Sequence, residues 1–154
     1  MNRMFHFSVF FALCLTAALT FSMLSGGVLS GAQENKPGIL VNVTSGKDSL
    51  HAVSMGLGLA KTALEKGQEV VVFLNVDAAV FATKSLGDDV QIADFAPVKK
   101  LVGDIIAAGG TVAVCEHCAH VCKVDTTDLV DGAVLSAHGS VLDMLKPGMV
   151  GFSY

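Results

Sequence analysis

The sequence predicts an α/β fold, a three-layer, flavodoxin-like domain built on a mainly parallel five-stranded sheet. Short runs rich in β-branched residues alternate along the chain with segments of helical periodicity. The strand-like runs are nearly all apolar, which is typical of parallel strands covered on both faces. Strands that alternate with helices are joined by right-handed crossovers, so the expected sheet is parallel.

Each element follows from a local pattern. The first helix should begin with Asp48 as its N-cap and end at Gly67 as its C′ residue. Pro97 should open the next long helix, and Gly109-Gly110 should stop it. The expected strands are 39–43, 69–75, 111–115, 131–136 and 149–153, and the expected short helices are 78–84, one or two turns after 115, and 140–145.

The N-terminal segment, residues 1–32, has the pattern of a secretory signal peptide. Arg3 precedes a long apolar run, and Ser30-Gly-Ala32 has the small-x-small form of a cleavage site. An uncleaved membrane anchor is the alternative, because about 20 apolar residues can span a bilayer. The protein is therefore expected to be exported to the periplasm, either free or anchored, with a linker at 33–38 and one domain at 39–154.

Composition excludes some classes of protein. The chain has 10 Lys plus Arg against 14 Asp plus Glu, which gives a formal net charge of −4, and no basic patch is present. These features argue against nucleic-acid binding. Ser45-Gly-Lys-Asp-Ser49 looks like a phosphate-binding loop but lacks the required glycines, so a capped turn explains it better.

Three cysteines and two histidines lie within the eight residues 115–122, directly after the apolar run 111–114. Ligands of parallel sheets bind beyond the carboxyl ends of the strands, and a helix start favours a thiolate. We therefore expect Cys115 to be a nucleophile and Cys118 to be a resolving thiol that can close a reversible disulfide with it.

Other interpretations of the cluster remain open. Thiolates and imidazoles bind zinc or copper, so the chain could be a non-catalytic metal-binding or oligomeric assembly module. The cysteines could also be small buried apolar residues. Attachment of c-type haem is excluded, because Ala119 and not a histidine follows Cys118. The ligands of a metal site would be Cys115, Cys118, Cys122, His117 and His120.

The chain resembles the DsrE/DsrF-like family of small sulfur-relay proteins. The resemblance covers about residues 39–152. It rests on the strand 39–43 with its turn Thr44-Ser-Gly46 and on the order of five further segments: Ala60-Lys-Thr-Ala-Leu-Glu-Lys-Gly67, Glu69-Val-Val-Val-Phe-Leu74, Ala79-Val-Phe-Ala-Thr-Lys84, Gly109-Gly-Thr-Val-Ala-Val-Cys115-Glu-His-Cys118-Ala and Asp128-Leu-Val-Asp-Gly-Ala-Val134.

This resemblance implies a function. Cys115 matches the cysteine that carries sulfur in the family, and Cys118 matches a second cysteine present in many relatives. The chain is then expected to be a sulfur carrier or sulfurtransferase that uses a persulfide on Cys115, without a metal or other cofactor, in periplasmic sulfur metabolism. Its partners would be sulfur donor and acceptor proteins or small sulfur species, and it would assemble into trimers or hexamers.

Overall fold

The computed structural model describes residues 37–154, so the predicted signal peptide and most of the linker lie outside the described residues. The described strands are β1 (Ile39–Val43), β2 (Val70–Leu74), β3 (Thr111–Cys115), β4 (Ala133–Ser136) and β5 (Val150–Ser153). The α-helices are α2 (Leu50–Glu65), α3 (Val98–Ala107) and α4 (Glu116–Val121), and the 3-10 helices are η1 (Lys47–Ser49), η2 (Val76–Ala82), η3 (Thr126–Asp128) and η4 (Ser140–Met144).

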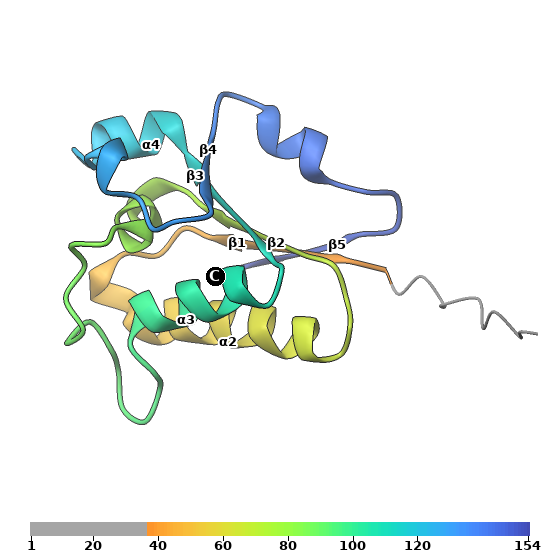
Figure 1. The fold of residues 1–154 in the computed structure, drawn as a ribbon, viewed down its shortest axis with the longest axis horizontal. Coiled ribbons are helices and arrows are strands. Elements are labelled where there is room, and N and C mark those ends of the chain that lie inside the picture. Colours follow the sequence, from red (N-terminus) through yellow and green to blue (C-terminus); the bar gives the residue numbers. More distant parts are fainter. Residues whose placement is uncertain (1–36) are drawn as a thin grey trace, which may run out of the picture. The chain divides into compact units, whose positions relative to one another are not determined.

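The five described strands form one sheet in the order β4-β3-β2-β1-β5 (Figure 1). All four neighbouring pairs are parallel. The predicted α/β fold with a five-stranded parallel sheet is therefore confirmed. Because every strand runs in the same direction, the carboxyl ends of β2, β3 and β4 meet at one edge of the sheet.

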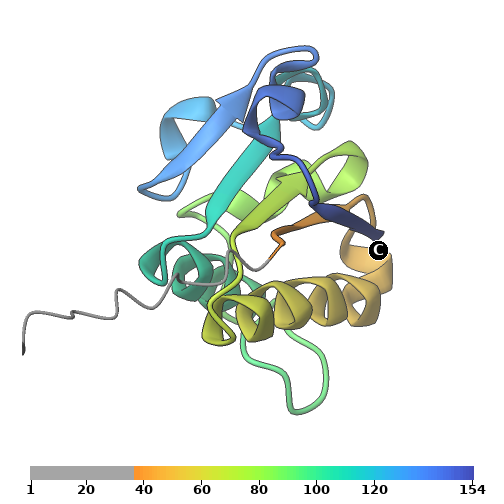
Figure 2. The ribbon, with the colours of Figure 1, turned by 90° about the vertical axis from the view of Figure 1, so that its right-hand side faces the viewer.

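Helices α2 and α3 pack side by side against one face of the sheet (Figures 1 and 2). Val53, Leu57 and Ala60 recur at helical spacing on α2 and are fully buried. Gly67 ends this helix as predicted, with a φ of +72° and a backbone hydrogen bond to Leu64. The predicted N-cap is wrong, because Asp48 lies within η1 and Ser49 occupies the cap position.

The connection between β4 and β5 passes on the opposite side of the sheet, where Val134, Gly151 and Ser153 stay exposed. Val70, Val72 and Leu74 belong to the core beneath the helices, so the alternation of a strand points Val71 and Phe73 to the other side. Figure 2 shows the connection (blue) passing the sheet on the side away from α2 and α3. Within residues 37–154, the two long helices α2 and α3 both lie on the other face.

A row of polar side chains joins three strands on this second face. The side-chain amide of Asn75 donates to Asn42 Oδ1 at 2.6 Å, and Asn42 in turn donates to Ser153 Oγ at 3.1 Å. The row holds the side chain of Asn75, and the register of β2 with β3 places this residue beside Cys115.

Membrane-spanning helices are not found in residues 37–154, where every helix is too short or too polar to cross a bilayer.

Candidate thiol site

Cys115 is both the last residue of β3 and the N-cap of α4. The apolar run before it is paired in the sheet, and the helix begins at the next residue. Its Sγ accepts a hydrogen bond from the backbone N–H of Cys118 at 3.4 Å. The structure thus places a half-buried thiol with a backbone donor where the sequence predicts a strand-to-helix turn.

Cys118 lies in the middle of α4, against the residue that starts η2. Burial raises the pKa of the Cys118 thiol above its ordinary value, and its hydrogen bond with Cys115 raises that pKa further. A backbone hydrogen bond from Val76 lowers this pKa and offsets part of the rise. The Cys118 thiol is therefore suited to stay protonated near neutral pH.

Cys122 caps the C-terminal end of the same helix. Its Sγ donates to the backbone carbonyl of Val76 at 3.4 Å. Val76 has a φ of +51°, an unusual conformation for a β-branched residue. One strained peptide segment therefore contacts both Cys118 and Cys122, and such strain often occurs at functional sites.

The thiols open into cavities around α4. The first cavity has a volume of about 270 Å³ and contains Cys115 and Cys118. The second has a volume of about 220 Å³ and contains Cys118 and Cys122, with Val76 and Val121 as apolar walls. Cys118 is common to both. All three cysteines of the described chain are free, so each is available for thiol chemistry.

The polar residues of the first cavity come from three parts of the chain: Asn75 after β2, His117 on α4, and Ser136 and His138 at the end of β4. His138, which no sequence motif singles out, lines the cavity that contains Cys115. Its role could have been inferred from its position: His138 follows β4, which pairs with β3, so both strands end at the same edge of the sheet.

The candidate metal ligands are not gathered into a site. His117 lines the first two cavities, whereas His120 is exposed and lines neither. Within residues 37–154, no group of three or more His, Cys, Asp or Glu side chains is arranged to hold a metal ion.

We expect Cys118 to react with iodoacetamide only at high pH, because the raised pKa keeps its thiolate fraction small near neutrality. The pH at which half of Cys118 is alkylated should be higher than for a free cysteine. In Cys115→Ala this pH should fall, because one contact that raises the Cys118 pKa is gone. Peptide mapping after alkylation across a pH series measures both. Alkylation of Cys118 at neutral pH as fast as free cysteine would contradict the assignment.

The fold and the site define a small parallel α/β protein that presents a free thiol at the carboxyl edge of its sheet. The model of the DsrE/DsrF-like family matches residues 38–149, and the chain belongs to this family. The resemblance found in the sequence is thus confirmed. Family membership indicates a role in sulfur relay.

Two solved structures share the fold. The YchN protein from E. coli has a TM-score of 0.61 and 16% sequence identity, over 75% of this chain and 99% of that one. MTH1491, a protein of unknown function from Methanobacterium thermoautotrophicum, has a TM-score of 0.59 and 11% identity, over 77% of this chain and 99% of that one. No curated protein matches the sequence. At these identities the structural similarity concerns the fold alone.

Proposed function

We propose that this protein is a sulfur carrier that holds sulfane sulfur as a persulfide on Cys115. The observation that carries the proposal is the position of Cys115. It is a free, half-buried thiol at the N-cap of α4, it lines a cavity of about 270 Å³, and it accepts the backbone N–H of a second cysteine. Membership of a sulfur-relay family supports the same chemistry.

The loading step needs no oxidant. The Cys115 sulfur attacks the outer sulfur of a persulfide R–S–SH, the S–S bond of the donor breaks, and R–SH leaves with the proton that Cys115 gives up. The product is Cys115–S–SH, with the oxidation level of the sulfane sulfur unchanged.

The unloading step can use Cys118. Its thiol lies beside Cys115, whose Sγ accepts the Cys118 backbone N–H, and can attack the inner sulfur of the persulfide. The products are a Cys115–Cys118 disulfide and hydrogen sulfide, which leaves with the proton of the Cys118 thiol. Alternatively, an external acceptor thiol takes the outer sulfur and leaves both cysteines reduced. Cys118 would then be the resolving thiol of the pair.

Incubation of the full chain with inorganic polysulfide tests the proposed function. The intact mass should rise by about 32 Da, the mass of one sulfur atom, and reductant should reverse the gain. A fully reduced protein that takes up no sulfur from polysulfide would refute the proposal.

We also propose that the carrier works in the periplasm as a trimer or hexamer. Exposed apolar side chains near the site, such as Val121 at 63% and Leu142 at 66% exposure, support contact with further copies. Protein recovered from the periplasm should lack residues 1–32 and have three or six times the subunit mass in native mass spectrometry. A monomer that keeps its N-terminal segment would contradict both proposals.

A further inference from the structure

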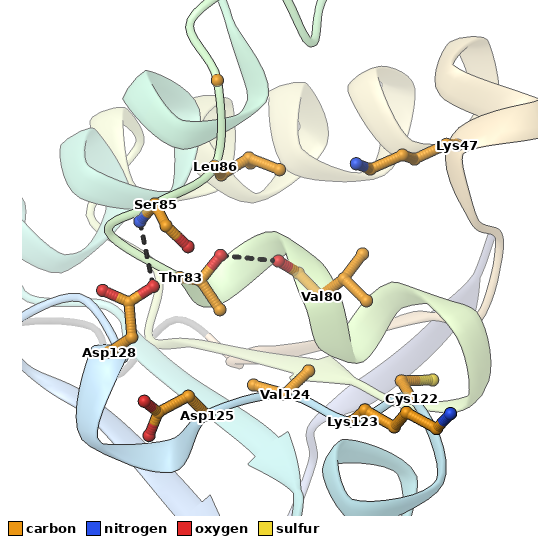
Figure 3. A pocket seen from close by; sticks show the side chains of 11 residues that line it. Lys47, Val80, Thr83, Ser85, Leu86, Cys122, Lys123, Val124, Asp125 and Asp128 are labelled. Carbon is orange, nitrogen blue, oxygen red and sulfur yellow. Dashed lines mark hydrogen bonds between the residues drawn. The ribbon is translucent and has the colours of Figure 1, made fainter.

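A third cavity lies at the C-terminal end of α4, and Cys122 is one of the residues that line it (Figure 3). Its volume is about 320 Å³, within the range typical of small-ligand sites. Three segments far apart in the sequence form its walls: η1, η2 with the loop that follows it, and the chain from Cys122 to η3. The sulfur-carrier function assigned to Cys115 leaves this cavity without a role.

The charges of this cavity are separated. In Figure 3, Lys47 lies on the upper right wall, Lys123 lies beside Cys122 at the lower right, and Asp125 and Asp128 lie on the left. Neither lysine ammonium has a hydrogen-bond or ion-pair partner within residues 37–154. A cation that lines a cavity without a partner is suited to receive an anionic group of a ligand.

The acidic end is only partly satisfied by the protein. Asp125 Oδ1 accepts from the backbone and hydroxyl of Thr127, and Asp128 Oδ2 accepts from the backbone N–H of Ser85 at 3.0 Å. The second oxygen of each carboxylate accepts no hydrogen bond in the described part of the chain, and the cation whose charge acts on Asp128 is Lys84. Val80 and Val124 form an apolar wall between the two ends. The cavity therefore matches a ligand with a cation at one end and an anion at the other.

Cys122 connects this cavity to the other two thiols. It also lines the second cavity together with Cys118, and both cysteines contact the Val76 segment. The backbone N–H of Cys118 in turn donates to Cys115 Sγ, and both residues line the first cavity. A sulfur atom on Cys122 thus has the Cys118 thiol as its neighbour, and Cys118 in turn neighbours Cys115.

We propose that this third cavity binds a zwitterionic low-molecular-weight persulfide of short-peptide size, and that Cys122 takes its sulfur and passes it through Cys118 to Cys115. The ligand carboxylate lies at Lys47 and Lys123, and its ammonium lies at Asp125 and Asp128. This inference rests on the proposed sulfur-carrier function and names the donor class that supplies it.

The chemistry of the transfer balances. The Cys122 sulfur attacks the outer sulfur of R–S–SH, the donor S–S bond breaks, and a new S–S bond forms on Cys122. The proton of the Cys122 thiol goes to the departing thiolate, so the products are Cys122–S–SH and R–SH. The same exchange, first to Cys118 and then to Cys115, moves the sulfur without an oxidant or a reductant.

Lys123 provides a variant that should keep the fold. It has a φ of +55° and is the C′ residue of α4, where its N–H bonds to His120 and the N–H of Val124 bonds to Ala119. Glycine adopts this conformation more readily than lysine. Lys123→Gly therefore removes one ammonium while preserving the end of the helix. Lys100→Gln, on α3 outside the cavity, is the matched control for loss of one positive charge.

The test compares two donors of similar size. One is the persulfide of the dipeptide Cys-Gly, with an ammonium at one end and a carboxylate at the other. The second is its N-acetylated, C-amidated form, which lacks both charges. For the charged donor, Lys123→Gly and Lys47→Gln should each raise the half-saturating concentration for loading about tenfold or more. Loading from the uncharged donor should not change in either variant, and Lys100→Gln should behave as wild type.

Cys122→Ser should slow transfer from the charged dipeptide persulfide to Cys115 and leave loading from inorganic polysulfide intact. In Cys115→Ser, sulfur from the dipeptide should collect on Cys118 and Cys122. Equal loading from both donors, or full-speed transfer from the dipeptide in Cys122→Ser, would overturn the inference and leave the sulfur-carrier function standing. Failure of every donor, polysulfide included, to load Cys115 would remove both.

Discussion

Cys115→Ser should abolish nearly all uptake of sulfur from inorganic polysulfide. Serine is a good N-cap residue, so α4 should still begin at the same place and the site should keep its shape. The serine hydroxyl stays protonated and is a weak nucleophile, so it cannot form a persulfide. Intact-mass spectrometry after polysulfide treatment, followed by peptide mapping, should find the added sulfur in wild type and little in the variant.

Cys122→Ser is the matched control, because it also replaces one thiol of α4 by a hydroxyl. We expect it to take up polysulfide sulfur as wild type does, since Cys115 lines a different cavity. Thermal melting of both variants verifies that they fold. If Cys115→Ser carries as much added sulfur as wild type, Cys115 is not the carrier residue.

Phe81→Ala should lower the free energy of unfolding by about 3–5 kcal/mol. Phe81 lies on η2, has no exposed surface and belongs to the main core. Helix η2 packs against α3, α4 and β3, so a cavity at this position weakens the contact between the core and the thiol-bearing helix. The variant should therefore also lose the contacts that Val76, at the start of η2, makes with Cys118 and Cys122.

Urea denaturation measures this loss of stability. Phe81→Leu keeps a large apolar side chain and should cost less, while Gln91→Ala at an exposed loop position should change stability by no more than about 0.5 kcal/mol. A loss below about 1 kcal/mol for Phe81→Ala would show that η2 contributes little to the core.

Most of the fold was predictable because its local signals agree. The strands are short β-branched runs. Gly67 ends α2 in the left-handed backbone conformation, which glycine adopts most readily. The error at Asp48 arose because a 3-10 turn precedes α2, and the sequence has no marker for that turn.

The position of Cys115 also followed from the sequence, since it depends only on the order of a strand and a helix. Its surroundings did not. His138 and Asn75 reach the cavity through the pairing of separate strands. The positive φ angles of Val76 and Lys123 have no signature, because the residues that usually mark this conformation are glycine and asparagine.

The placement of three free thiols along one short helix has a consequence for survival in an oxidising compartment. Cys118 adjoins both of the other cysteines, yet one sulfur can join only one partner in a disulfide. Whichever internal bridge forms, parity leaves the third thiol reduced. A disulfide formed within a subunit would therefore change which cysteine of α4 is free, and one free thiol would always remain.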